Sequence, residues 1–249
     1  MAIKKPYHRL YRPMIEGRYG GDYQHDYNFA KDPTHYTRSF FMIQEDIKKL
    51  FRYIEPADQN LQTYSLEIYQ LLLRTATEIE ANFKAILREN EYNKSKNLNI
   101  HDYKKINHSH HLDAYSAEFP IWTGEKRIYS PFKPWRTKDS LNWYMAYNQC
   151  KHDRIKNLHF ANFENLLNAY CGLFILLCSQ FGSCSYEPGP VLLCLGQDSN
   201  YYHGDFGLGD YLIIHYPTDW VQDDYYDFDW NELKNTEKRF SKFDYNIIK

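Results

Sequence analysis

The spacing of apolar residues in the first half of the chain predicts two amphipathic helices. In residues 37–53, apolar side chains recur at steps of three and four and form one helical stripe: Phe40, Ile43, Ile47 and Leu50. Pro56 ends this stretch, because proline has no backbone N–H with which to continue a helix. Residues 59–91 carry a longer stripe of the same spacing, which consists of Ile68, Leu72, Ala76, Ile79, Phe83 and Ile86.

The second half of the chain predicts two more helices. Residues 141–156 follow Ser140, which is a candidate N-cap. Residues 160–181 are apolar on almost every side between 166 and 178, which is typical of a helix at the centre of a bundle. Gly182 follows this helix at the position where a left-handed C-cap is expected.

The segment between these two pairs predicts a loop and then a β-hairpin. Residues 92–117 are polar and lysine-rich, which favours a loop. Residues 119–132 are rich in aromatic and β-branched residues on both sides of Thr123 and Gly124, which favours a hairpin. We therefore expect a mainly α fold, in which a four-helix domain over residues 37–184 carries a β-hairpin insertion.

The two ends of the chain differ from this helical part. Residues 1–36 predict an extended arm, whereas residues 185–249 predict a β-containing extension that packs on the bundle, with short strands at 191–195 and 211–216 and a helix at 231–240. The extension has twelve acidic residues against five Lys and Arg. This asymmetry makes the helical part the expected anion-binding portion. The acidic extension either covers that basic surface or completes the fold by burying three side chains: Trp220, Phe228 and Trp230.

Composition narrows the class of protein. The 249 residues are 43% hydrophobic and 25% charged, with a net charge of −2, which excludes a mainly disordered chain and a basic coat for nucleic acid. An odd number of cysteines in a chain without an apolar leader indicates a reducing, cytoplasmic setting. The most apolar run, residues 169–178, is too short to cross a bilayer, so no membrane association is expected.

The sequence gives no reason to expect a metal or another cofactor. The five cysteines contain no C-x-x-C pair. The histidines at 101, 108, 110 and 111 lack a carboxylate or cysteine partner and are best explained as part of a solvated loop. The aspartates at 223, 224, 227 and 229 do not have the spacing of a calcium loop.

Candidate chemistry gathers at the end of the third predicted helix. Asn148 and His152 are four residues apart and share a helix face, and Lys151 and Arg154 flank them. Histidine can transfer protons near neutral pH, and Lys and Arg can neutralise charge on a phosphate. This combination suits metal-free RNA cleavage, in which the 2′-hydroxyl attacks the adjacent phosphate. A run of cations at a helix C-terminus is also what the helix dipole favours, so a structural role stays open.

The second predicted helix supplies two supporting residues. Glu80 and Lys84 form an i, i+4 pair beside the apolar stripe. Glu80 is therefore a candidate to pair with Lys151 or Arg154, or to orient His152.

These residues and the order of the helices resemble the HEPN superfamily of prokaryotic helical domains. The matching segments are TEIEANFKAIL (77–87), WYMAYNQCKHDR (143–154) and the apolar run that begins FANFENLL. The usual motif has an arginine four to six residues before the histidine, whereas Asn148 stands at the four-residue offset here and Arg154 follows the histidine. The resemblance therefore assigns the histidine role to His152 and the phosphate-binding role to Lys151 or Arg154.

The resemblance implies a function and partners. Many members of the superfamily are metal-independent endoribonucleases of phage-defence, toxin–antitoxin or CRISPR systems, and others are non-catalytic RNA-binding or assembly modules. They typically form homodimers in which two motifs face each other. We therefore expect RNA as a ligand, a homodimer, and an antitoxin or another defence protein as a partner. The alternative is a non-catalytic helical binding or assembly protein in which His152 is structural.

Overall fold

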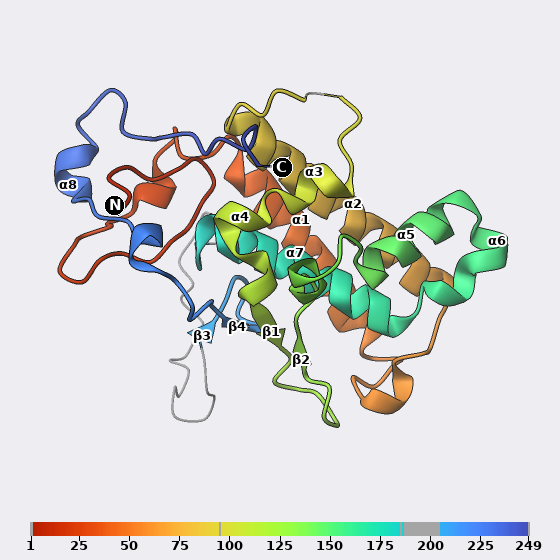
Figure 1. Ribbon diagram of the computed structural model, residues 1–249. Coiled ribbons are helices and arrows are strands. Elements are labelled where there is room, and N and C mark those ends of the chain that lie inside the picture. Colours follow the sequence, from red (N-terminus) through yellow and green to blue (C-terminus); the bar gives the residue numbers. More distant parts are fainter. Residues whose placement is uncertain (1, 95, 185, 187–204, 249) are drawn as a thin grey trace.

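The computed structural model describes residues 2–94, 96–184, 186 and 205–248, and the chain there is mainly helical with a small antiparallel sheet (Figure 1). The four long helices are α1 (Pro33–Leu50), α2 (Leu66–Glu89), α5 (Asn142–His152) and α7 (Phe163–Phe181). The short ones are α3 (Ile100–Lys104), α4 (Asn107–His110), α6 (Arg154–Asn157) and α8 (Trp230–Leu233). The strands are β1 (Ser116–Glu118), β2 (Ile128–Tyr129), β3 (Asp205–Phe206) and β4 (Ile213–His215). The prediction of a mainly α fold is thus confirmed.

Helix α7 forms the centre of the core, as its apolar sequence predicts. It contacts α1, α2 and α5, and almost all of its side chains are buried. The ring of Tyr170 stacks on Phe40 of α1, with 5.5 Å between the ring centroids. The helix begins three residues later than predicted because the Asn162 side chain accepts a hydrogen bond from the Asn165 N–H and caps it. Gly182 ends it at φ 63° and ψ −128°, so the predicted left-handed C-cap is wrong although φ is positive.

A capping residue and a break in the backbone set limits of α2 and α5. Helix α2 begins at Leu66 rather than near 59, because the Ser65 hydroxyl accepts a hydrogen bond from the Ile68 N–H. The predicted helix 141–156 is broken at Asp153, whose extended backbone (φ −145°, ψ 87°) ends α5 and whose side chain caps α6. The prediction that Ser140 is the N-cap of α5 is wrong, since Leu141 holds that position without a side-chain bond.

The prediction of a loop over residues 92–117 is wrong from residue 100 onward. This segment contains α3, α4 and strand β1. Helix α3 forms despite its polar sequence because Asn99 and Asp102 make a reciprocal capping box. Its Tyr103 is buried, and the ring stacks on Phe83 of α2 at 5.0 Å between centroids. Packing on α2 therefore outweighs the low helix propensity of the segment.

The predicted hairpin is present but begins earlier in the chain. Strands β1 and β2 are antiparallel, and Ala117 pairs with Tyr129. Strand β4 adds to the other edge of β1 and gives the order β2-β1-β4-β3, so the predicted strand at 211–216 is confirmed in its centre. The predicted strand at 191–195 lies outside the described residues. The predicted helix at 231–240 is only one turn long (α8), and the chain beyond it pairs with the N-terminal arm through Ser241 and Tyr7.

The N-terminal arm and the acidic extension pack on each other. Backbone bridges join Tyr226 to both Ile3 and Met14. Asp227 pairs with Lys4 and Arg18, and Asp224 lies 2.9 Å from Arg12, so carboxylates of the extension neutralise cations of the arm. Phe228 and Trp230 are buried and Trp220 is half-buried, as expected for a segment that completes the fold.

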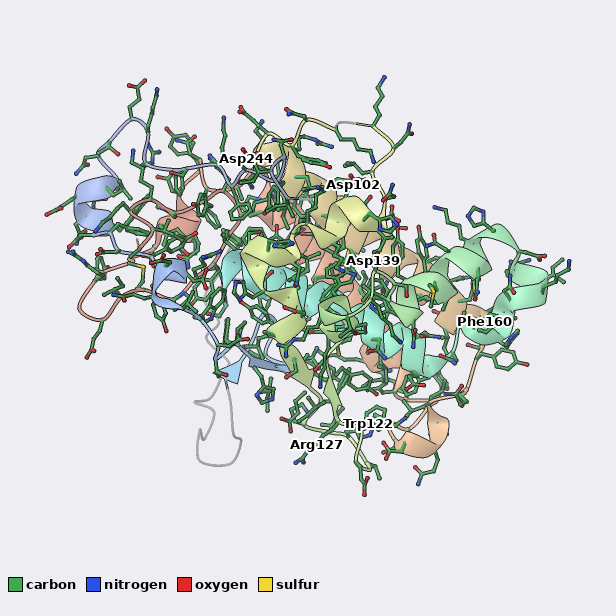
Figure 2. All side chains as sticks on the ribbon, in the orientation of Figure 1. Asp102, Trp122, Arg127, Asp139, Phe160 and Asp244 are labelled. Carbon is green, nitrogen blue, oxygen red and sulfur yellow. The ribbon has the colours of Figure 1, made fainter. Side chains whose placement is uncertain are left out.

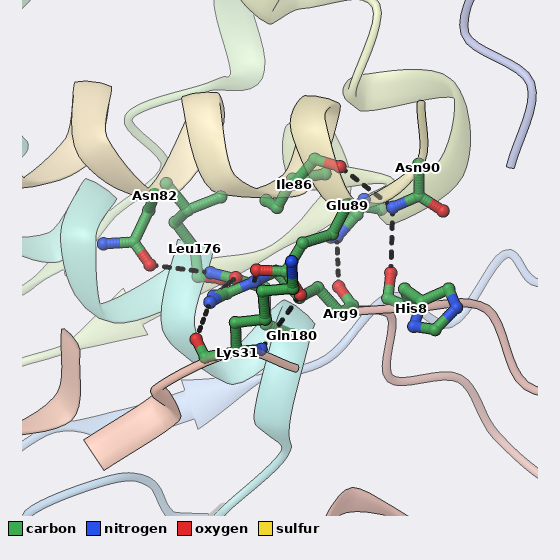
Figure 3. Close-up of polar contacts among 10 residues, drawn as sticks. His8, Arg9, Lys31, Asn82, Ile86, Glu89, Asn90, Leu176 and Gln180 are labelled. Carbon is green, nitrogen blue, oxygen red and sulfur yellow. Dashed lines mark hydrogen bonds and ion pairs between the residues drawn. The ribbon is translucent and has the colours of Figure 1, made fainter. Parts of the chain in front are cut away.

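Arg9 anchors the arm to the helical core. Its side chain is fully buried and donates to three acceptors: Glu89 at 2.7 Å, Gln180 at 2.9 Å and the Lys31 carbonyl at 2.6 Å (Figure 3). Nearby, the Asn90 side chain donates to the His8 carbonyl. The buried guanidinium of Arg9 therefore connects the arm to the C-terminal ends of α2 and α7.

His110 links the arm to the last residues of the chain. Its Nε2 lies 2.8 Å from the Arg9 carbonyl, which can only accept, so Nε2 carries the proton in the neutral ring. Its Nδ1 lies 2.7 Å from the Ser109 hydroxyl, which in turn lies 2.7 Å from the Tyr245 hydroxyl. Burial, with a contribution from the positive charge of Arg12, lowers the pKa of His110 to about 3.

We expect this histidine to make the protein less stable as the pH falls. The folded state holds its pKa at about 3, below the ordinary 6.5, so the unfolded chain binds more protons between these values. Stability is then fully present above pH 6.5, and His110 alone lowers the free energy of unfolding by about 3 kcal/mol between pH 6.5 and pH 4. Urea unfolding at a series of pH values measures this slope. His110→Gln should flatten the slope, whereas His108→Gln, an exposed control on the same helix, should leave it unchanged.

Candidate functional site

The candidate residues lie on the outer side of α5 and on α6. Trp143, Tyr147 and Cys150 face the core and are buried, and their spacing fixes the orientation of α5. His152 is therefore exposed on the opposite side, and Lys151 is exposed at the flank of the buried face, one turn after Tyr147. The remaining candidate of α5, Asn148, is half-exposed.

His152 is an exposed side chain at the last residue of α5. Its imidazole makes no hydrogen bond or ion pair with any residue that the structure describes. In particular, Glu80 does not orient it, because the Glu80 carboxylate has other partners. Both ring nitrogens of His152 can therefore reach a ligand.

Lys151 is held in place by an aromatic neighbour. Its Nζ lies 3.2 Å from the hydroxyl of Tyr147 and 5.2 Å from the centroid of the same ring. The hydrogen bond to Tyr147 raises the pKa of Lys151, so this side chain is positively charged at any physiological pH. An ordered cation therefore stands next to His152.

Arg154 lies on α6 rather than on α5, because Asp153 interrupts the helix. The expectation that all four candidate residues share one helix is thus wrong. The Arg154 guanidinium lies 5.9 Å from the centroid of Tyr69 on α2, within the range of a cation–π contact. Arg154 is two positions after His152 along the chain, so their Cα atoms are at most about 7.6 Å apart and both can reach one phosphate.

Glu80 and Lys84 form the expected pair, with 3.1 Å between Lys84 Nζ and Glu80 Oε2. The other carboxylate oxygen of Glu80 accepts a hydrogen bond from the Tyr144 hydroxyl at 2.9 Å. The expectation that Glu80 bonds to Lys151, Arg154 or His152 is therefore not met. Its negative charge is nevertheless close enough to contribute to the raised pKa of Lys151.

Sequence reasoning missed the tyrosines that support these charged residues. Tyr144, Tyr147 and Tyr69 contact Glu80, Lys151 and Arg154 in turn. A local signal existed for Tyr147 alone, which precedes Lys151 by four residues in the same helix. The other two contacts join different helices, which no sequence spacing reveals.

The other candidate sites have structural explanations. Cys150 donates to the Asn157 carbonyl, and burial raises the pKa of its thiol, which disfavours a reactive thiolate. Cys171 and Cys178 are buried in α7, as predicted, and Cys194 lies outside the described residues. The prediction of a solvated histidine loop is wrong for His110, which is buried.

Two further features of the described residues bear on cofactors and membranes. No three of their His, Cys, Asp or Glu side chains are grouped so that they could hold a metal ion. Among the helices that the structure describes, none combines the length and apolar character needed to cross a bilayer.

Apolar side chains are exposed beside the charged ones. Ile155 of α6 is 90% exposed and Phe160 is 38% exposed (Figure 2 labels Phe160). Exposed apolar side chains mark a contact with a partner where they form a contiguous patch, so these two residues are candidates for such a contact.

Comparison with known families, curated proteins and solved structures finds no significant match for this chain. The candidate function therefore depends on the residues of α5 and α6 and on their surroundings.

Proposed function

We propose that this protein is a metal-independent RNA-cleaving or RNA-binding protein of the HEPN-like type, with its site at the end of α5 and on α6. The observation that carries the proposal is an exposed histidine that bonds to no described residue, with a lysine held by Tyr147 beside it and an arginine two residues later. The order of α2, a hairpin insertion, α5 and α7 agrees with the HEPN-like arrangement.

The proposed chemistry uses these residues as follows. His152 removes the proton from a ribose 2′-hydroxyl, and the resulting oxygen attacks the adjacent phosphorus. Lys151 and Arg154 neutralise the charge that develops on the phosphoryl oxygens. The P–O5′ bond breaks, and the leaving oxygen takes up a proton. The products are a 2′,3′-cyclic phosphate and a 5′-hydroxyl end.

A homodimer fits this chemistry, because two facing sites would supply one histidine as base and a second as acid. An antitoxin or another defence protein is the proposed regulatory partner. To Asn148, which is half-exposed one turn before His152, we assign the role of orienting the imidazole or bonding a ribose when RNA is bound.

A second candidate function is favoured by the exposed Ile155 and Phe160. In that case the same face is an assembly surface of a non-catalytic helical protein. The exposure of His152 does not favour a structural role for it in the core. Cleavage assays separate the two candidates, since an assembly protein leaves RNA intact.

We expect Lys151→Ala and Arg154→Ala to slow RNA cleavage. Loss of a preorganised donor to a developing charge costs about 2 to 4 kcal/mol, which is on the order of 30- to 1,000-fold in rate. The assay is single-turnover cleavage of a mixed-sequence RNA, with and without EDTA, and the chelator should have no effect. Lys126→Ala, an exposed lysine in the hairpin turn, is the matched control and should cleave like the wild type. If EDTA stops cleavage, the metal-free mechanism is wrong.

A further inference from the structure

Three surface hollows follow one another along the ends of α1 and α2. The first, of about 890 Å³, lies at the start of α1 and is lined by Tyr27, Lys31 and Arg38 among others. The second, of about 290 Å³, shares Tyr27 and Lys31 with the first and reaches Arg88 at the end of α2. The third, of about 180 Å³, shares Arg88 and continues to Lys84. Neighbouring hollows share side chains, and we call the three together the basic groove.

The basic groove carries an excess of positive charge. Lys31, Arg38 and Arg88 are exposed, and their side chains form no ion pair with any described residue. Three further cations line the groove with one carboxylate each, namely Lys84 with Glu80, Lys94 with Asp102 and Lys242 with Glu91.

Carboxylates do not cancel this charge. The Glu89 carboxylate accepts a hydrogen bond from the Lys31 backbone N–H and forms an ion pair with the buried Arg9 guanidinium. Arg9 therefore already balances the charge of Glu89. Asp32 is exposed at the rim of the first hollow. The three cations that form no ion pair with a described residue outnumber this one carboxylate. The net positive charge favours binding of a polyanion.

Aromatic rings lie between the cations. Tyr27 is 81% exposed and lines both the first and the second hollow. Tyr92 lines the third hollow and is half-buried. Cations spaced along a groove with interleaved aromatic rings are the arrangement that binds single-stranded nucleic acid, because the cations follow the phosphates and the rings stack on bases.

The groove runs toward the candidate site. Lys84 in the third hollow bonds to Glu80, and Glu80 bonds to Tyr144 of α5. Lys151 lies seven residues beyond Tyr144 on the same helix, about 10 Å along its axis. Figure 1 shows that the end of α2 lies near the start of α1, whereas α5 and α6 lie toward the other end of α2.

We propose that the basic groove binds the phosphate backbone of single-stranded RNA and leads the strand along α2 to His152. This inference rests on the proposed function, since it names the path of the same ligand beyond the site.

The test is a titration of a fluorescent 20-nucleotide RNA whose 2′-hydroxyls are methylated, so that it cannot be cleaved. Lys31→Ala, Arg38→Ala and Arg88→Ala are combined in one groove variant. Its dissociation constant should rise about tenfold or more, and the slope of log affinity against log salt should fall by about 2, at about 0.7 per lost phosphate contact. Tyr27→Ala should weaken binding about tenfold through lost stacking.

The matched control combines Arg52→Ala, Lys126→Ala and Arg127→Ala, which removes the same charge from exposed cations outside the hollows. It should bind like the wild type.

If both triple variants bind equally, the groove inference is wrong while the proposed function stands. If the wild type binds no RNA at low salt, both fail. If a duplex of the same length binds as tightly through the same cations, the single-strand assignment is wrong. If the groove variant binds weakly but unmodified RNA is never cleaved, the groove stands and the catalytic proposal fails.

Discussion

Replacing His152 with alanine is expected to abolish RNA cleavage and to leave the fold intact. A proton-transferring side chain contributes roughly 100- to 10,000-fold to rate, so the residual rate should be close to the background. Because the side chain is exposed and makes no bond to a described residue, the free energy of unfolding should change by less than about 0.5 kcal/mol. Single-turnover cleavage and urea unfolding of the same preparations measure both quantities.

The control for this experiment is His108→Ala, which removes another exposed histidine. It should retain full activity. Binding of the uncleavable RNA should also persist in the His152→Ala variant, since the basic groove is unaltered. If His152→Ala cleaves as fast as the wild type, the catalytic proposal is wrong. If it unfolds, His152 is a structural residue in spite of its exposure.

Replacing Arg9 with methionine is expected to destabilise the protein by about 3 to 5 kcal/mol. Methionine keeps much of the apolar stem but removes the guanidinium, which leaves Glu89 as a largely buried carboxylate without its ion-pair partner. Gln180 and the Lys31 carbonyl lose a donor as well. Urea unfolding should show a lower midpoint, and proteolysis should cut the N-terminal arm faster.

Arg18→Met is the matched control for Arg9. Arg18 also bonds a carboxylate, at 2.5 Å from Asp227, but its side chain is 48% exposed. Exposed ion pairs contribute about 0 to 1 kcal/mol, so this variant should be nearly as stable as the wild type. Replacing both Arg9 and Glu89 with methionine should recover part of the loss. Equal effects of Arg9→Met and Arg18→Met would show that the buried pair does not anchor the arm.

The long helices could be predicted because each has one apolar face that must be covered. The stripe from Ile68 to Ile86 and the apolar run of 166–178 both identify buried helix faces, and every residue of α7 from Ala169 onward is buried. Helix ends were predicted less well, since a single hydrogen bond decides them. Ser65 and Asn162 each cap a helix several residues inside the predicted limits. Short helices such as α3 were missed because their stability comes from Tyr103 packing on α2.

The orientation of the candidate site could also be read in part from the sequence. Buried Trp143, Tyr147 and Cys150 leave His152 on the outer side of the same helix and Lys151 at the flank beside Tyr147, and this follows from helical spacing alone. The Glu80–Lys84 pair is likewise local. The position of Arg154 was missed because the backbone of Asp153 breaks the helix at that point.

The sequence by itself determined the mainly helical class, the central apolar helix, the hairpin insertion and the exposed charged end of α5, because these depend on periodicity and on residues a few positions apart. Only the tertiary structure decided which distant groups meet. Arg9 reaches Glu89 and Gln180, and Lys31 comes to line one hollow together with Arg88. Such contacts form when separate faces bury their apolar surface together, and that packing brings together residues whose separation in the sequence carries no signal.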